Sequence, residues 1–382
     1  MWNDYYSKLD KIKTEPIIIY LLISLGILIR IAFIFVSPAK DGDYEFYLYP
    51  WILFFQSHGY WNALKYEFYD YTPLYLYAVG LIAKSGLNPL VMFKILSYLF
   101  EYITAFFIGK IAQIKHPNPS TLLLSLGLFP LLPTVLINGG YWAQCDAIYV
   151  CFIIASIYYL MVNRLLYSII LLGIAFSLKL QTMIIAPFYL IMMLKGKVKW
   201  YFFLIVPFIY LLSISPAWIA GRPLDNLLSI YIRQSSQYTF LTLQFPNIYF
   251  WVNNDFYQIG KYLGLIFSSI LVITTSFVLS NKKYDFSLDI WLVLALVSAC
   301  VMPFILPGMH ERYMYLGDTL AVIYVLYFRK NIALMASIVF ISFYSYLLCT
   351  RLTHYLPLFP IFGLYVIVLY YLITNFIRQL SK

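Results

Sequence analysis

The sequence predicts an all-α polytopic membrane protein, and three observations support this fold class. Of its 382 residues, 63% are hydrophobic and only 11% are charged, whereas soluble domains carry roughly 25% charged residues. The apolar residues form runs such as 16–36 and 356–377, which match a hydrocarbon core at about 1.5 Å per helical residue. The runs lack the alternation of polar residues that a membrane strand requires. Helices are therefore the expected spanning elements.

The apolar runs predict about 12 transmembrane helices in one domain over residues 1–382. No heptad, low-complexity segment or repeat of fixed period divides the chain. Three lysines precede the first run, which is too long for a signal peptide and should remain as a helix. The predicted spans are 17–36, 89–112, 119–137, 145–162, 165–179, 181–194, 200–219, 259–280, 287–306, 313–328, 331–349 and 356–377.

Basic residues predict the orientation of the chain. The net charge of +10 arises from lysines and arginines that lie between apolar runs, so we expect positive-inside topology and no nucleic-acid partner. With the N-terminus inside, residues 37–88 form the first outer loop and residues 220–258 a second long outer loop. Two short helices, 43–56 and 73–84, should lie at the membrane interface within the first loop. Arg30 and Glu101 are charged residues inside predicted spans, as a buried pair or at cavity walls.

The four cysteines give no sign of a disulfide or metal framework. They lie within or beside apolar runs and lack metal-ligand spacing. We therefore interpret them as small apolar residues. They are Cys145, Cys151, Cys300 and Cys349.

Polar clusters that are unusual for a membrane protein all fall on the predicted outer side. The first two belong to the loop 37–88. Asp41 and Asp43 are paired carboxylates that can accept a proton or hold a divalent cation. The alternative for Asp43 is an ordinary helix N-cap. Asp70 and Tyr71 precede Pro73, so Asp70 is either a site residue or the cap of the helix that this proline begins.

The next clusters interrupt apolar runs. Residues 138–146 form a polar segment that includes Trp142, Gln144 and Asp146; an acidic residue at such a position is usually functional. Lys179 and Gln181 separate two predicted spans. The ammonium group there suits an anionic phosphate, unless it merely extends to the interface.

The last clusters follow later in the chain. The loop 220–258 contains arginines, glutamines and many aromatic residues, and is either a substrate cover or a simple loop. Residues 307–313 include His310, Glu311 and Arg312 and should open a helix, where a phosphate is favoured by the helix dipole. Consecutive positions on a helix point in different directions, so we expect no direct mutual triad of these three. Together, the outer carboxylates and cations suit an anionic leaving group displaced by a hydroxyl.

Several of these fragments, in this order, resemble bacterial integral membrane mannosyltransferases related to the enzyme that adds the second mannose of GPI anchors. The resemblance covers roughly residues 37–320 and departs from the family at two points. Thr72 stands where the family usually has proline, and Ala143 where it usually has glycine. The matching fragments are Asp43 with Trp51, 70–77, 140–146, 177–181 and 309–313.

The resemblance implies a GT-C glycosyltransferase fold with a polyprenyl-phosphate sugar as donor, and mannose as the sugar. It implies a bacterial plasma membrane protein whose site faces away from the cytoplasm, with a lipid or glycan hydroxyl as acceptor. An acidic residue of the first outer loop is the base, which places that role on Asp43, with Asp41 as the near alternative. A divalent cation is compatible with this chemistry but is not required.

The remaining site residues then receive two roles. Positive charge already in place where negative charge develops would stabilise the departing lipid phosphate; the candidates are Lys179, His310 and Arg312. Sugar or acceptor hydroxyls would be held by the other polar residues. These are Asp70, Tyr71, Trp142, Gln144, Asp146, Gln181 and Glu311.

Two other classes of membrane protein remain open. A flippase or transporter would place charges near the bilayer midplane, whereas these clusters gather at one face. A ligase or polymerase of lipid-linked glycans would also use basic outer residues, and it differs in taking a diphosphate-linked oligosaccharide. The sequence does not identify the sugar, the acceptor or the oligomeric state.

Overall fold

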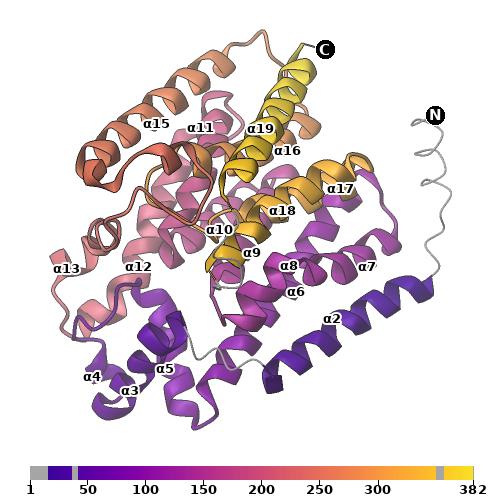
Figure 1. Cartoon of the computed structure of the whole chain (residues 1–382). Helices are drawn as coiled ribbons and strands as arrows, with labels where there is room; N and C mark the ends of the chain where they lie inside the picture. The colour runs from indigo at the N-terminus through magenta and orange to yellow at the C-terminus, as the bar shows by residue number, and fades with distance from the viewer. Residues whose placement is uncertain (1–15, 37–41, 350–356, 382) are drawn as a thin grey trace.

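The computed structural model describes residues 16–36, 42–349 and 357–381, and they are predominantly helical (Figure 1). Within these residues, seven helical segments are long and apolar enough to cross a membrane. They are α2 (Pro16–Val36), α6 (Pro89–Lys115), η5 with α12 (Trp200–Leu204 and Ile205–Ile219), η7 with α15 (Asn254–Phe256 and Tyr257–Ser280), α16 (Leu288–Ile305), α18 (Ile332–Cys349) and α19 (Phe359–Leu380). The predicted all-α, multi-pass class is therefore correct.

The other apolar segments are broken or short. One pair is bent by 57° and would count as an eighth span if it crossed as a unit. Pro130 and Pro133 lie at this break, because proline cannot donate the backbone hydrogen bond that continues a helix. The bent pair is α7 and η2 (Pro119–Leu128, Phe129–Leu131) with α8 and η3 (Pro133–Val135, Leu136–Tyr141). The short helices of 10–17 residues are α9 (Asp146–Met161), α10 (Leu165–Leu178), η4 with α11 (Leu180–Ile185, Ala186–Leu194) and α17 (Tyr315–Phe328).

Buried and lipid-facing helices are clearly distinguished. In the apolar windows of α2, of η5–α12 and of η7–α15, only 17% of the residues are buried, against 67% in α16. Helix α9 is buried along most of its length and packs against α6 and α10. The three outer segments thus expose apolar side chains as a membrane protein does toward lipid, while α9 and α16 form the interior.

The predicted loop helices pack against the helical bundle and share its hydrophobic core. In the predicted first outer loop the structure has η1 (Tyr44–Leu48), α3 (Tyr49–His58), α4 (Tyr60–Ala63) and α5 (Pro73–Ser85). Figure 1 shows α3, α4 and α5 gathered at one end of the molecule, beside α12 and α13, and α5 contacts α3 and α12. The second outer loop has α13 (Leu224–Leu228), α14 (Ile230–Gln234), β1 (Thr242–Leu243) and η6 (Ile248–Trp251).

Arg30 and Glu101 bind each other inside the helical bundle. The guanidinium of Arg30 donates from Nε at 2.9 Å and also from Nη2 to Glu101 Oε2, and the two side chains are 4% and 0% exposed. Gly139 lies directly against this pair, because a Cβ there would come within 2.1 Å of Glu101 Oε1. The pair joins α2 to α6 and requires glycine in η3.

Removing one partner of this buried pair should strongly destabilise the fold. In Glu101→Ala the Arg30 charge stays buried without a counter-charge, which costs about 3–5 kcal/mol. The matched control is Asp289→Asn, which removes the charge of the exposed pair with Lys115 (2.7 Å, side chains 38% and 40% exposed) but keeps an oxygen that can accept from the Tyr327 hydroxyl, and it should cost less than about 1 kcal/mol. Thermal unfolding of the purified protein in detergent measures both. Equal losses in the two variants would contradict this account of the pair.

Candidate functional site

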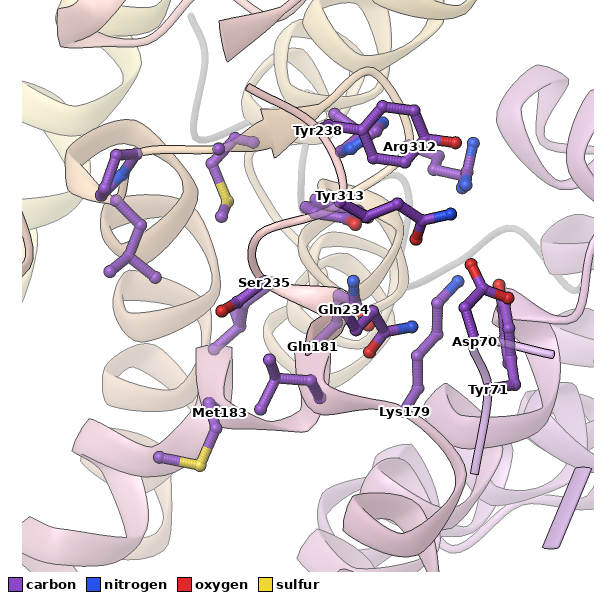
Figure 2. Close-up of a pocket in the computed structure, with 18 of the residues that line it drawn as sticks. Asp70, Tyr71, Lys179, Gln181, Met183, Gln234, Ser235, Tyr238, Arg312 and Tyr313 are labelled. Carbon is purple, nitrogen blue, oxygen red and sulfur yellow. The ribbon is translucent and has the colours of Figure 1, made fainter. Parts of the chain in front are cut away.

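One cavity of about 480 Å³ brings together the separate polar clusters of the sequence. Its wall includes residues from the first outer loop, from the segment before α9, from the junction of α10 and η4, from the second outer loop and from the segment after α16. Figure 2 shows Asp70, Tyr71 and Lys179 on one side of this space, with Gln181, Gln234 and Ser235 between them and Met183. Five segments far apart in the sequence thus meet at one place.

The carboxylate of Asp146 is the centre of the polar network behind this wall. It is completely buried and accepts from Lys179 Nζ at 2.5 Å and from Asn138 Nδ2 at 2.8 Å. Arg312 Nε lies 3.7 Å from it. Lys179 is only 3% exposed, so it does not extend to the interface; burial of both charges favours their pairing.

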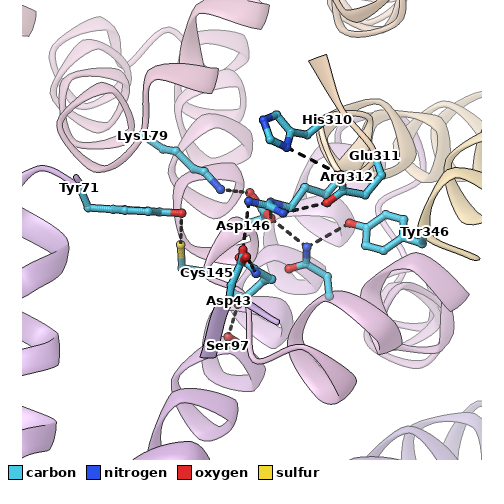
Figure 3. Close-up of polar contacts among 12 residues, drawn as sticks. Asp43, Tyr71, Ser97, Cys145, Asp146, Lys179, His310, Glu311, Arg312 and Tyr346 are labelled. Carbon is cyan, nitrogen blue, oxygen red and sulfur yellow. Dashed lines mark hydrogen bonds and ion pairs between the residues drawn. The ribbon is translucent and has the colours of Figure 1, made fainter. Parts of the chain in front are cut away.

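Asp43 is held in the cavity by two partners. Its Oδ2 accepts from Gln144 Nε2 at 2.5 Å and lies 3.2 Å from Arg312 Nη2. It precedes η1 but makes no capping hydrogen bond through its side chain, so the simple N-cap interpretation is wrong. Figure 3 shows Asp43 and Asp146 on either side of the Arg312 guanidinium. Asp41, the alternative base, lies outside the described residues.

Residues 307–313 do not open a helix, contrary to the prediction. Met309–His310 forms β2, which pairs in parallel with β1, and α17 begins only at Tyr315. In this non-helical backbone Glu311 meets both neighbours: Arg312 Nη1 donates to Glu311 Oε1 at 2.8 Å, and His310 Nδ1 lies 3.8 Å from Oε2. The helical geometry from which we expected no mutual triad is therefore wrong, and Glu311 contacts each of its two neighbours.

Burial keeps His310 neutral. Its side chain is 12% exposed, and burial, followed by the nearby charges of Arg312 and Lys179, lowers its pKa to about 3. The ring lies between those of Tyr238 and Tyr313, each 5.0 Å away between centroids. At neutral pH this residue offers a hydrogen bond and no charge.

Asp70 lines the cavity and does not cap α5. The N-cap residue of α5 is Thr72, one of the departures from the family pattern, and its hydroxyl donates to the Ser177 carbonyl at 2.5 Å. Oδ1 of Asp70 is buried without a hydrogen-bond partner, as is Oε1 of Gln181. Burial raises the pKa of Asp70. The cavity wall thus presents free hydrogen-bond acceptors.

Some predicted site residues lie behind the wall. Trp142 stacks on Tyr346 with ring centroids 5.1 Å apart and does not line the cavity. Asp146 and Glu311 are also absent from the lining and act through Lys179 and Arg312. The described lining residues include the other predictions, which are Asp43, Asp70, Tyr71, Gln144, Lys179, Gln181, His310 and Arg312.

The local backbone that presents Gln144 is unusual. Ala143 has a φ of 55°, in the left-handed region that favours glycine. This is the position at which the family that the sequence resembles usually has glycine, so the departure falls where the backbone conformation is costly for alanine. The residue is 1% exposed, and the surrounding packing holds it there.

The second outer loop supplies residues that the sequence alone did not single out. Tyr238 lines the cavity and shares a hydrogen bond of 2.8 Å with Tyr47, which links the two outer loops. No sequence signal distinguished either ring, because the chain has 38 tyrosines and membrane proteins enrich them at interfaces. The loop 220–258 therefore forms part of the site.

The part of the cavity away from the charged residues is mainly apolar. Leu265 and Val272 from α15, Met302 from α16 and Ile184 from η4 line it, and α15 also contributes Lys261, Ser268 and Ser269. Helix α15 is one of the outer helices that expose apolar side chains. The cavity therefore joins a charged end to an apolar end beside the lipid-facing surface.

No metal cluster or covalent link is evident in the site. Within residues 16–36, 42–349 and 357–381, no three His, Cys, Asp or Glu side chains are grouped so as to hold a metal ion. All four cysteines are free, and the Sγ of Cys145 lies 3.8 Å from the Tyr71 hydroxyl in the cavity.

Comparison with known proteins identifies no family for this chain. No protein-family model matches the chain, and no curated protein matches it.

The neutral state of His310 predicts a loss of stability in acid. Because the folded protein lowers the pKa from 6.5 to about 3, the unfolded chain binds the proton more tightly. The stability linked to this group is complete above pH 6.5 and is lost as the pH falls toward 3. We expect His310→Gln to lose less thermal stability than the wild type between about pH 7 and pH 5, measured by tryptophan fluorescence. His58→Gln, at an exposed position, should keep the wild-type slope; identical slopes in all three proteins would contradict the assignment.

Proposed function

We propose that this protein transfers a sugar from a polyprenyl-phosphate sugar to a hydroxyl group, as an inverting glycosyltransferase. The observation that carries the proposal is the cavity with a charged end and an apolar end. A polyprenyl-phosphate sugar has the same two parts, because its phosphate and sugar are polar and its chain is hydrocarbon. Mannose as the sugar, and membership of the GT-C superfamily, rest on the sequence resemblance.

The donor phosphate would lie beside Lys179 and Arg312. Both cations are fixed by carboxylates, Lys179 by Asp146 and Arg312 by Asp43 and Glu311. Charges held in position before the substrate arrives need no reorganisation when negative charge develops on the leaving phosphate. His310, which is neutral, would donate a hydrogen bond to the same group.

The reaction would be a single displacement. The acceptor oxygen forms a bond to the anomeric carbon of the sugar, the bond from that carbon to the phosphate oxygen breaks, and the lipid phosphate leaves with the electron pair. A phosphate leaves without a general acid, so one carboxylate that accepts the hydroxyl proton is sufficient. Asp43 and Asp70 both line the cavity and are the candidates. The proposal requires no divalent cation.

The membrane arrangement follows from the same proposal. We count twelve crossings by including the four short helices and the bent pair, with the N-terminus inside and the cavity at the outer face of a bacterial plasma membrane. The basic residues between the spans support this orientation. The donor would enter from the lipid beside α15, and the acceptor would be a lipid or glycan hydroxyl.

Transfer from a lipid monophosphate donor is the direct test. Membranes containing the wild type should transfer radiolabelled sugar from polyprenyl-phosphate mannose, or from the glucose or arabinose equivalent, whereas Asp43→Asn should lose about 100-fold or more of that rate. The mutation removes the charge that holds Arg312. The control Asp289→Asn changes a carboxylate of similar exposure, 40% against 33%, and should retain full activity. Transfer only from a diphosphate-linked oligosaccharide would instead identify a glycan ligase.

The apolar end predicts a dependence on the donor chain. Val272→Arg introduces a charge among Leu265, Met302 and Ile184, so it should raise the KM for a long-chain polyprenyl donor by about 10-fold or more. A donor with a very short chain does not reach this end and should be affected little. Steady-state kinetics with both donors measure the difference. Equal effects on the two donors would place the lipid chain elsewhere.

A further inference from the structure

A second cavity adjoins the first one. It has a volume of about 300 Å³, and three of its lining residues also line the main cavity: Asp70, Gln234 and Gln237. Its remaining lining comes from Glu67, Tyr69, Ile230 and Arg233. In contrast to the main cavity, this space has no apolar end beside a lipid-facing helix. The two cavities are therefore neighbours with different chemistry, and they share one polar wall.

The shared wall presents hydrogen-bond acceptors that lack donors. Oδ1 of Asp70 and Oε1 of Gln234 are both buried and have no hydrogen-bond partner in the structure. A buried acceptor without a donor is unfavourable, so these atoms are suited to a ligand that donates hydrogen bonds. Sugar hydroxyl groups are such donors, whereas a phosphate or a hydrocarbon chain is not.

An exposed ion pair at the rim of the second cavity can open to bind a ligand. Arg233 Nε lies 2.9 Å from Glu67 Oε1, with the side chains 39% and 49% exposed. Asn226 also donates to Glu67, and Arg233 donates to the backbone carbonyl of Asn226 at 2.9 Å. Exposed pairs of this kind contribute little to stability, so their groups can bind sugar hydroxyls instead of each other.

Asp43 and Asp70 differ in the partners of their carboxylates. Asp43 lies 3.2 Å from Arg312 and its Oδ2 already accepts from Gln144. Asp70, by contrast, has no Lys, Arg or His partner within ion-pair distance among the described residues; Gln237 is a hydrogen-bond partner of its carboxylate, and Oδ1 has no hydrogen-bond partner. Burial raises the pKa of Asp70, which makes its carboxylate a stronger base.

We propose that the second cavity binds the sugar of a carbohydrate acceptor and that Asp70, in the wall between the two cavities, accepts the proton of the attacking hydroxyl. This inference rests on the proposed transferase function and specifies its acceptor. The hydroxyl oxygen bonds to the anomeric carbon of the donor sugar, its proton passes to the Asp70 carboxylate, and the phosphate leaves with the electrons of the broken bond. Asp43 then serves to position Arg312 and Gln144.

Two variants, each with one cysteine added to the four native ones, test the binding part without requiring turnover. Glu67→Cys lies in the second cavity only, and Met183→Cys in the main cavity only; both positions are exposed. The rate of reaction with a water-soluble maleimide is measured against the unsubstituted chain. Methyl glycosides of mannose and glucose should slow labelling at position 67 by several-fold and not at 183. Polyprenyl phosphate should slow labelling at position 183 by several-fold and not at position 67.

These labelling rates separate the two proposals. If polyprenyl phosphate protects position 183 but no glycoside protects position 67, the acceptor assignment is overturned while the donor cavity stands. If a glycoside protects position 67 but polyprenyl phosphate does not protect position 183, the proposed donor is wrong and the sugar site stands.

Kinetics of purified protein in lipid nanodiscs test the proton acceptor. With radiolabelled polyprenyl-phosphate mannose as donor and octyl mannoside as acceptor, Asp70→Asn should lower kcat by about 100-fold or more, because the amide cannot accept the proton. Both KM values should change little. Arg233→Trp, which obstructs the second cavity, should raise the KM for the acceptor and not for the donor. Its control is Lys115→Trp, at a cation of matched exposure, 38% against 39%. Asp70→Asn with more than half of the wild-type kcat would overturn the role of Asp70.

Discussion

The rest of the site depends on the ion pairs and hydrogen bond of the buried Asp146 carboxylate. It accepts from Lys179 and Asn138 and lies beside Arg312, while Asn138 also donates to Tyr346 at 3.0 Å. These residues come from α9, the α10–η4 junction, η3, the segment before α17, and α18. One buried charge that must be compensated therefore joins five segments of the chain.

The irregular backbone around this carboxylate is a consequence of the same requirement. The π-helical turn η3, the left-handed Ala143 and the 3₁₀ segment η4 each interrupt a helix at the polar network. Non-helical backbone at membrane depth is tolerated only where protein or a cavity supplies its hydrogen bonds. Here, for example, Thr72 donates to the carbonyl of Ser177 near the end of α10. The polar interruptions of the apolar runs are thus the places where the helices break to form the cavity.

In the proposed reaction, the two cavities would hold different substrates. The main cavity holds cations that are already paired, so it can receive an anionic group without leaving a buried charge exposed when it is empty. The second cavity is polar and lies next to unpartnered acceptors of Asp70 and Gln234. Asp43 and Asp70 both belong to the segment before α6, but Asp43 has an ion-pair partner in Arg312, and the proposal therefore assigns the two carboxylates different roles.

The sequence by itself determined the helical membrane class, the approximate helix positions and eight of the residues that line the main cavity, because apolar run length and polar interruptions are local properties of the chain. It also suggested the pairing of Arg30 with Glu101. Only the tertiary structure decided that Trp142 stacks away from the cavity, that residues 307–313 form a strand and turns, and that Tyr238 joins the site. These outcomes depend on contacts between segments far apart in the sequence, which no local pattern of side chains encodes. The structure also distinguished the paired carboxylate of Asp43 from the unpaired one of Asp70, because a side chain's charge environment is set by whichever segments fold against it.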